Sequence, residues 1–214
     1  VTEGSERPQW IAGPNTLVFH MRSSRRLMGF IDGAITVLAD STDHAKAAAG
    51  KDLVAFVDGA GSFQVVHKGR RTELSAFTPY GFQVGAGICG FVDMAGRLKV
   101  YQDGVVKQLT DTMPSFYSVT DSVLLFVRNG RLMTYHDGDS HLVEDIVPEL
   151  WVVKDATIHY LDLNRGIRTY RYGERERITK DGAYETFSVY GKAVRYPGHD
   201  GLTHIRWRDR DHAY

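Results

Sequence analysis

Residues 114–147 read PSFYSVTDSVLLFVRNGRLMTYHDGDSHLVEDIV, and this stretch decides the fold. It holds four short segments rich in Val, Leu, Phe and Tyr, at 116–120, 122–128, 131–137 and 140–144. Such residues favour strands, and the side chains of 131–137 alternate with a period of two rather than 3.6. Asn129-Gly130 and Asp137-Gly138 separate segments, and both dipeptides accept the positive φ angles of tight hairpins. The stretch therefore predicts a four-stranded antiparallel meander.

The same pattern recurs along the whole chain. An aromatic residue followed by x-Asp-Gly, or a near variant of it, begins at positions 30, 66, 101, 135, 170 and 207. A second landmark, aromatic in every copy, precedes each of these in the same phase, at Phe19, Phe56, Phe91, Phe126, Tyr160 and Tyr196. Self-similarity at a fixed period is the mark of a repeat architecture. We expect six copies, at about 8–43, 44–78, 79–113, 114–147, 148–182 and 183–214.

One four-stranded sheet cannot cover both of its own faces, so the copies must pack on one another. Four-stranded repeats of about 40 residues are typical of β-propellers, and closing the series into a ring removes exposed sheet edges. The sequence thus predicts an all-β fold with a single domain over 1–214. That domain would be a six-bladed β-propeller with four-stranded antiparallel blades of about 35 residues.

Proline is the first residue of four of the copies, at Pro8, Pro79, Pro114 and Pro148. Proline cannot donate to a strand ladder and suits the connection between blades. Each Pro-led copy is therefore expected to be one whole blade. In the alternative phase, residues 9–13 would instead pair beside 211–214 as the outer strand of the last blade.

The charge balance excludes whole classes of partner. Lys plus Arg and Asp plus Glu both number 26, and a net charge of zero argues against a nucleic-acid or anionic-membrane binder. The one cysteine, Cys89, excludes an intrachain disulfide and a cysteine zinc cluster, and its apolar segment predicts a buried thiol. No apolar run is long enough for a membrane helix. Because residue 1 is Val rather than Met, the chain is processed, trimmed or part of something longer, and of these we favour processing for export.

Two motifs resemble ligand sites but lack the required context. Residues 85–90 match G-x-G-x-x-G, yet a strand pattern follows instead of the helix that a dinucleotide site needs. Asp137-Gly138-Asp139 would start a calcium loop only with Gly and Glu where Leu142 and Pro148 stand. No H-E-x-x-H or G-x-S-x-G motif is present. We expect no catalytic residue, no cofactor and no metal site.

The three tryptophans are expected in the core rather than on sugar-stacking platforms. Trp207 is read as the repeated aromatic residue of the sixth copy. Trp10 and Trp151 follow the recurring proline by two or three places, where Phe82 and Phe116 also lie.

The copies differ most in the turn between the second and third predicted strands. Those turns emerge on one face of a propeller, where binding loops on a rigid scaffold carry such variation. The first copy supplies two arginines there and the sixth a His-Asp pair. The predicted partner-binding residues are Arg25, Arg26, Asn129, Asn164, His199 and Asp200.

Residues 53–58, LVAFVD, followed by 62–69, SFQVVHKG, resemble an exported bacterial propeller repeat of the "VAYVDxxGxFKVxYxG" type. Residues 91–93 and 98–101 fit that unit equally well. The resemblance implies a non-enzymatic, extracytoplasmic protein, periplasmic or secreted, and transfers no catalytic residue. It suggests a protein-binding accessory or scaffold subunit of an envelope-associated complex, attached to a membrane through its partner at most. A plug-like role in an outer-membrane secretion translocon would fit this type. The alternative is a carbohydrate-binding or glycan-cleaving propeller, which rests on analogy of fold.

Overall fold

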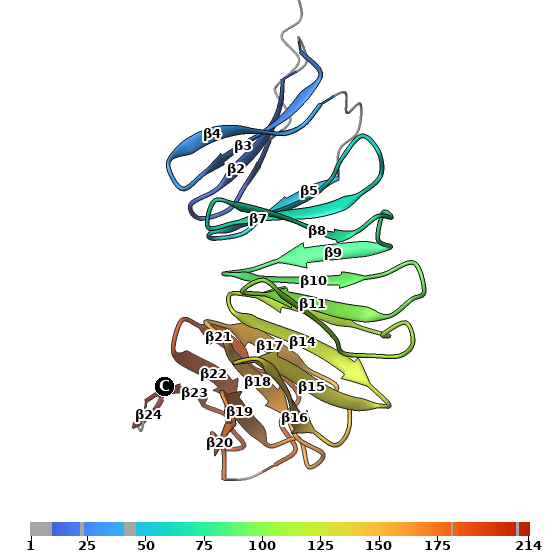
Figure 1. Cartoon of the computed structure of the whole chain (residues 1–214). Helices are drawn as coiled ribbons and strands as arrows, with labels where there is room; N and C mark the ends of the chain where they lie inside the picture. The colour runs from blue at the N-terminus through green and yellow to red at the C-terminus, as the bar shows by residue number, and fades with distance from the viewer. Residues whose placement is uncertain (1–9, 22–23, 41–45, 181, 209) are drawn as a thin grey trace, which may run out of the picture. The chain divides into compact units, whose positions relative to one another are not determined.

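The computed structural model describes residues 10–21, 24–40, 46–180, 182–208 and 210–214. Within these ranges the regular structure is all β-strand, arranged as six sheets of four antiparallel strands (Figure 1). No helix in the described ranges is long and apolar enough to cross a membrane. Pro8 and the first residues of the second copy lie outside the described residues.

Each sheet uses four strands that are consecutive in sequence. Sheet 1 holds β1 (Trp10–Ala12), β2 (Leu17–Met21), β3 (Arg26–Ile31) and β4 (Ala34–Ala39). Sheet 2 holds β5 (Ala47–Ala49), β6 (Leu53–Val57), β7 (Phe63–His67) and β8 (Arg70–Ser75). Sheet 3 holds β9 (Gly81–Val84), β10 (Ile88–Val92), β11 (Leu98–Gln102) and β12 (Val105–Gln108).

The remaining strands follow the same order. Sheet 4 holds β13 (Tyr117–Thr120), β14 (Val123–Arg128), β15 (Arg131–His136) and β16 (Asp139–Glu144). Sheet 5 holds β17 (Trp151–Lys154), β18 (Thr157–Leu161), β19 (Ile167–Arg171) and β20 (Glu174–Arg177). Sheet 6 holds β21 (Ser188–Tyr190), β22 (Ala193–Pro197), β23 (Thr203–Trp207) and β24 (Arg210–Ala213). One copy of the repeat thus makes one sheet, as the position of the prolines predicts, and β1 pairs with β2.

The chain forms two compact units, 1–124 and 125–214. In the first unit, sheet 1 buries Val18, Leu27 and Leu38 against Val54 and Phe56 of sheet 2. The other face of sheet 2 packs in the same way on sheet 3, through a second apolar cluster. Burial of one such side chain stabilises the fold by about 2 kcal/mol. The second unit has a comparable cluster between sheets 5 and 6. Face-to-face burial between successive sheets is therefore the core.

Glycines let the first strands of successive sheets approach closely. Gly13, Gly50 and Gly85 begin the turns that follow β1, β5 and β9, and we call them the inner-turn glycines. A Cβ on Gly13 would lie 1.9 Å from the carbonyl oxygen of Gly50, and one on Gly50 would lie 2.2 Å from that of Gly85. Likewise, a Cβ on Gly85 would lie 2.0 Å from the carbonyl oxygen of Asp121. Two hydrogen bonds strengthen the series, from Thr16 Oγ1 to the Gly50 carbonyl at 2.6 Å and from the Ala86 amide to the Asp121 carbonyl at 2.6 Å.

The hairpins between the third and fourth strands confirm the turn prediction. Asp137 and Gly138 have φ angles of 49° and 84°, and Asp32-Gly33 and Asp103-Gly104 show the same pair of positive values. Asp137-Gly138 is thus a tight turn, as the recurrence of Asp-Gly indicates. The G-x-G-x-x-G match at 85–90 runs into strand β10, so the helix that a dinucleotide site requires is absent there.

The core prediction for the tryptophans is wrong for Trp10 and Trp207. Their exposed fractions are 62% and 44%, whereas Trp151 is half-buried. In sheet 5, Tyr170 pairs with Ile158, and the equivalent pair in sheet 6 is Arg206 with Val194. Arg206 therefore occupies the repeated aromatic position of the sixth copy, and Trp207 lies one residue beyond it.

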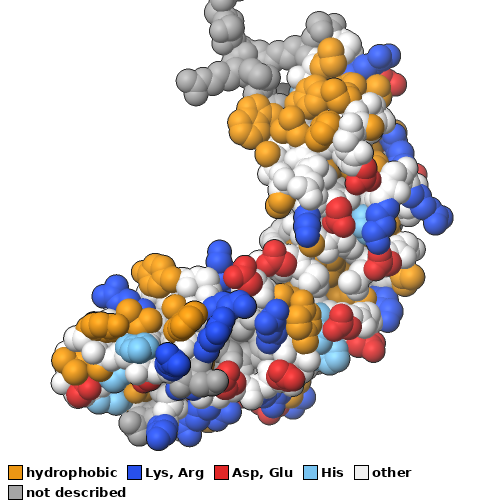
Figure 2. Space-filling model, turned by 90° about the vertical axis from the view of Figure 1, so that its left-hand side faces the viewer, with side chains coloured by type: hydrophobic (Ala, Val, Ile, Leu, Met, Phe, Trp, Pro, Cys, Tyr) orange, Lys and Arg blue, Asp and Glu red, His pale blue; other side chains and the backbone are white. Residues whose placement is uncertain are grey.

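One face of sheet 1 is apolar and open. Cross-strand pairing puts two rows of side chains on the face opposite to the core shared with sheet 2. The first row is Trp10, Phe19, Met28 and Val37, and the second is Ala12, Leu17, Phe30 and Ile35. Ile35 is 65% exposed, and Figure 2 shows hydrophobic side chains gathered at this end of the first unit. We call these eight residues the open face of sheet 1.

Substitution of Gly50 by Ala tests the close approach of the inner turns. The new methyl group would meet the backbone of Gly85, so we expect a loss of about 3 kcal/mol in the free energy of unfolding. Gly104→Ala is the control, because nothing lies within 4 Å of its Cβ position and only its φ of 87° opposes a side chain. That variant should lose about 1 kcal/mol. Urea unfolding measures both values, and equal losses would contradict the inner-turn contact.

Candidate functional site

The turns between the second and third strands have a rigid base. In sheet 3 the Asp93 side chain is buried, and its Oδ1 accepts hydrogen bonds from the amides of Ala95 at 2.9 Å and Arg97 at 3.0 Å. Its Oδ2 accepts from Arg97 Nε at 3.0 Å and lies 2.9 Å from Lys99 Nζ. The carboxylate thus holds both ends of the turn and the start of β11.

Sheets 2 and 5 repeat this arrangement. Asp58 accepts from the amides of Ala60 at 2.9 Å and Ser62 at 3.0 Å. Asp162 accepts from the amides of Asn164 at 3.0 Å and Gly166 at 2.8 Å, and Arg168 Nε donates to its Oδ2 at 2.6 Å. These three aspartates were absent from the predicted site residues. The recurring Val-Asp at 57–58 and 92–93 was the signal that could have found Asp58 and Asp93.

The aspartates at the base are held in the ionised form. Burial alone would raise the pKa of Asp93, but hydrogen bonds from Lys99 and from the amide and side chain of Arg97 outweigh it and hold that pKa well below its usual range. Burial would likewise raise the pKa of Asp162, but hydrogen bonds, above all the one from Arg168, outweigh it and lower that pKa. Both carboxylates therefore remain charged over the physiological range.

The tips of the turns carry the predicted partner-binding residues, and all six are exposed. In the first unit, Arg25 has a positive φ of 55°, and Arg26 Nε donates to Asp40 Oδ1 at 2.8 Å. In the second unit, Asn129 and Gly130 form a tight turn with φ angles of 54° and 74°. In sheet 4 the turn between the second and third strands is therefore short, and Arg128 rather than an aspartate precedes it.

Asn164 and His199 come together at the connection between sheets 5 and 6. The carbonyl of Asn164 accepts from the amide of Ala183 at 2.8 Å. His199 Nε2 lies 2.8 Å from the carbonyl oxygen of Gly182, to which it donates. A Cβ on Gly182 would lie 2.2 Å from the Asn164 carbonyl oxygen, so the connection is closely packed on the turn. The structure therefore unites two of the predicted residues on one surface of the second unit.

Asp200 pairs with a histidine that the sequence did not single out. His204 Nε2 lies 3.1 Å from Asp200 Oδ2, and His204 Nδ1 lies 3.4 Å from Asp211 Oδ2. Tyr196 donates to the same Asp211 oxygen at 2.7 Å. The hydrogen bond to Asp200 is the main cause that raises the pKa of His204 above its ordinary value. His199 and Asp200 are sequence neighbours, but the ion pair joins Asp200 to His204 across the β22–β23 turn.

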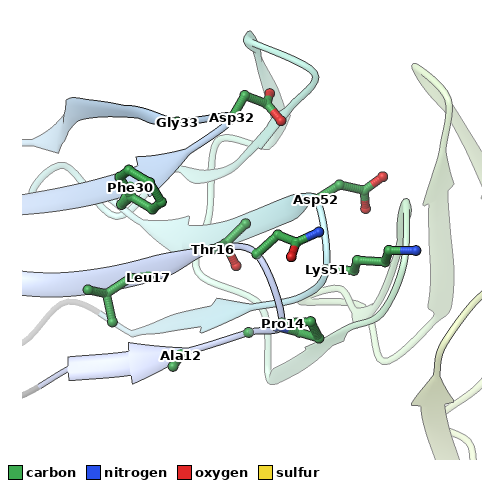
Figure 3. Close-up of a pocket in the computed structure, with 11 residues that line it drawn as sticks. Ala12, Pro14, Thr16, Leu17, Phe30, Asp32, Gly33, Lys51 and Asp52 are labelled. Atoms are coloured by element: carbon green, nitrogen blue, oxygen red, sulfur yellow. The ribbon is translucent and has the colours of Figure 1, made fainter.

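A shallow groove of 630 Å³ opens on sheet 1 (Figure 3). Leu17 and Phe30 line it from the open face of sheet 1, and Lys51 and Asp52 line it from the β5–β6 turn. Asp52 accepts from the amide of Gly87 at 2.7 Å and is therefore held in place. The groove continues the apolar open face and ends at charged side chains. Among the described residues, no group of three His, Cys, Asp or Glu side chains lies close enough to hold a metal ion.

Residues 1–209 match a family described as the 10-bladed beta propeller domain. The chain belongs to this family. Its six four-stranded sheets are accordingly propeller blades. No curated protein matches the sequence.

Solved structures superpose on this propeller at low sequence identity. Human WBSCR16 superposes with a TM-score of 0.51 at 7% identity, over 97% of this chain and 78% of that one. The computationally designed protein Ika8 gives a TM-score of 0.43 at 13% identity, over 92% and 70%. PorZ, a surface component of the type-IX secretion system of Porphyromonas gingivalis, gives 0.41 at 13%, over 96% of this chain and 32% of PorZ. The WBSCR16 likeness supports the fold alone.

Removal of the Asp93 carboxylate tests the rigid base. Asp93→Ala leaves two amides and the Lys99 ammonium without their acceptor, so we expect a loss of about 2–3 kcal/mol in the free energy of unfolding. Asp145→Ala is the matched control, because its ion pair with Arg131 is exposed and 3.5 Å long. Its loss should stay below about 0.5 kcal/mol. Equal losses in urea unfolding would contradict the role of Asp93.

The depressed pKa of Asp93 also predicts a pH dependence. Its stabilising contribution is fully present above the unfolded value of about 4 and is lost as the pH falls through the lower folded value. Between pH 5 and pH 2 the wild-type chain should therefore lose more stability than Asp93→Ala. Parallel thermal unfolding curves of the two proteins over this range would contradict the expectation.

Proposed function

We propose that this propeller is a non-enzymatic, protein-binding scaffold, an accessory subunit of an exported or envelope-associated complex. The observation that carries the proposal is the contrast within the turns between the second and third strands. Buried carboxylates such as Asp93 and Asp162 fix the base of the turns, whereas the tips are exposed and differ from sheet to sheet. Varied tips on a rigid frame suit recognition of another surface.

The chemistry of the tips favours a protein as the partner. Arg25 offers a cation, Asn129 and Asn164 offer amides that donate and accept, and Asp200 offers a carboxylate. A net charge of zero gives no general attraction to a polyanion. A mixed polar protein surface, such as the rim of a larger assembly, matches this set. A plug-like position in an outer-membrane secretion complex is the specific form of this proposal.

We further propose that the six blades close into one ring. The open face of sheet 1 is apolar along two full rows, and such a face is stable in water only when another surface covers it. In sheet 6, the face that carries Tyr190, Ile205 and Trp207 is opposite to the face that shares a core with sheet 5. Tyr190 is 63% exposed. Closure would bring these two faces together as the sixth interface.

Small-angle X-ray scattering of the 214-residue chain tests closure. A closed ring should be monomeric, with a radius of gyration of roughly 17 Å, the value for a compact chain of this length. The family description counts ten blades, so a ring completed by further blades is the competing arrangement. In that arrangement the isolated chain would be more extended or would oligomerise through the open face, and either result would contradict closure by six blades.

Co-purification from the envelope fraction of the native cells tests the scaffold role. The tagged chain should retain one protein in constant ratio, and the double substitution Arg25→Glu with Asn164→Asp should release it. Arg70→Gln, an exposed change on β8 away from these turns, is the matched control and should retain the partner. The absence of any stoichiometric partner would contradict the scaffold role. Retention by the double variant would contradict the assignment of these turns.

A further inference from the structure

A cleft of 680 Å³ lies between sheets 5 and 6, within the second unit. Its lining comes from β18, β19, β20, β22 and β23 and from the turns after β17 and β21. This volume is in the range of sites that hold small molecules, roughly 300 to 1,000 Å³. The lining residues that matter most are His159, Thr169, Arg171, Glu176, Lys192 and Arg206.

The cleft exists where two positions of the repeat change from apolar to polar. His159 immediately precedes the landmark aromatic residue of its blade. The equivalent residues of the first four blades are small or apolar and buried, namely Val18, Ala55, Gly90 and Leu125. Arg206 holds the position that is otherwise Phe30, Val66, Tyr101, Tyr135 and Tyr170. Both changes meet at a single interface.

Both polar side chains present a buried nitrogen that has no hydrogen-bond partner within the part of the chain that the structure describes. His159 is 5% exposed, and its Nδ1 has no hydrogen-bond partner. The Nε of Arg206 is also buried and has no partner among the described residues, although the Arg206 Nη2 lies 3.6 Å from Glu176 Oε1. An unpaired buried polar atom costs about 1–3 kcal/mol, and a bound ion or water is one of the explanations for such an atom in a native structure. Glu176 thus faces the outer end of the Arg206 guanidinium in the cleft.

The charge of the lining selects an anion. Six lining residues are cationic: Lys154, Arg171, Arg175, Lys192, Arg206 and Arg208. Three are acidic: Asp155, Glu174 and Glu176. This excess is local, because the whole chain has a net charge of zero. An excess of one sign of charge on low-dielectric walls attracts a ligand of the opposite sign.

We infer that the cleft between sheets 5 and 6 binds a small phosphate or sulfate ester, with its oxyanion held by Arg206 and His159. Arginine presents a fork of N–H donors that matches tetrahedral oxyanions, and His159 supplies one further nitrogen at the floor. Burial lowers the pKa of His159 to about 4, so the ring is neutral at pH 7 and acts as a hydrogen-bonding group. The inference does not depend on the proposed scaffold role, which rests on the turns between the second and third strands.

Titration calorimetry with glucose 6-phosphate, inorganic phosphate, sulfate, citrate and glucose tests the site. The wild-type chain should bind glucose 6-phosphate and inorganic phosphate or sulfate, and added NaCl should weaken binding because the interaction is electrostatic. Glucose should give no signal. Binding of citrate alone would overturn the assignment to phosphate or sulfate, and the absence of any anion binding would overturn the site.

The repeat itself supplies variants that remain folded. His159→Leu and Arg206→Tyr introduce the residue types found at the equivalent positions of other blades, where Leu125 and Tyr170 stand. The double variant should melt at the same temperature as wild type or higher, because it replaces unpaired polar atoms with the usual apolar core. Its affinity for glucose 6-phosphate should fall by about tenfold or more. Unchanged affinity in this folded variant would overturn the inference.

Arg70→Gln is again the matched control, since it removes a cation from the exposed strand β8 outside the cleft. Its affinity for glucose 6-phosphate should equal that of wild type. An equal loss of affinity in Arg70→Gln and in the double variant would show a response to net charge alone and would also overturn the inference.

Discussion

The constraint on which the structure depends is that each four-stranded sheet has two faces and can bury neither by itself. Phe56 on one face of sheet 2 packs against sheet 1, and Val65 on the other face packs against sheet 3. Each interface therefore needs the next sheet, and each sheet needs two neighbours. The inner-turn glycines follow from this requirement, because the apolar faces meet only if the first strands approach to backbone contact.

Most of the fold could be predicted because its determinants are local. Alternating side chains within 131–137 and the positive φ angles of Asp137-Gly138 depend on neighbours in sequence, and both were visible in a single copy. The aromatic position of the sixth blade could not be assigned so simply. Trp207 follows its landmark Tyr196 by the same spacing that separates Phe30 from Phe19, yet the register selects Arg206. A turn that differs by one residue reverses which face a side chain occupies, and spacing alone does not reveal it.

For the candidate sites too, features that depend on local sequence could be predicted, whereas contacts between residues brought together by the fold could not. The turns that carry Asn129 and Asn164 were found from variation among copies. The pairing of Asp200 with His204 was not, because it joins residues across a turn whose conformation the sequence did not define. The cleft at His159 was missed for a related reason. Its two polar nitrogens come from different blades, and the error of one residue at Trp207 concealed the change at Arg206.

The consecutive order of strands within every blade bears on how the chain is made. In each of the six sheets, every strand pairs only with strands adjacent to it in sequence. A nascent chain that leaves the ribosome can complete sheet 1 before the residues of sheet 3 are synthesised, and each new blade then condenses on a finished template. Low contact order of this kind favours rapid assembly with few trapped intermediates. Maturation would thus advance vectorially, and closure of the ring as proposed would bury last the surface that was produced first.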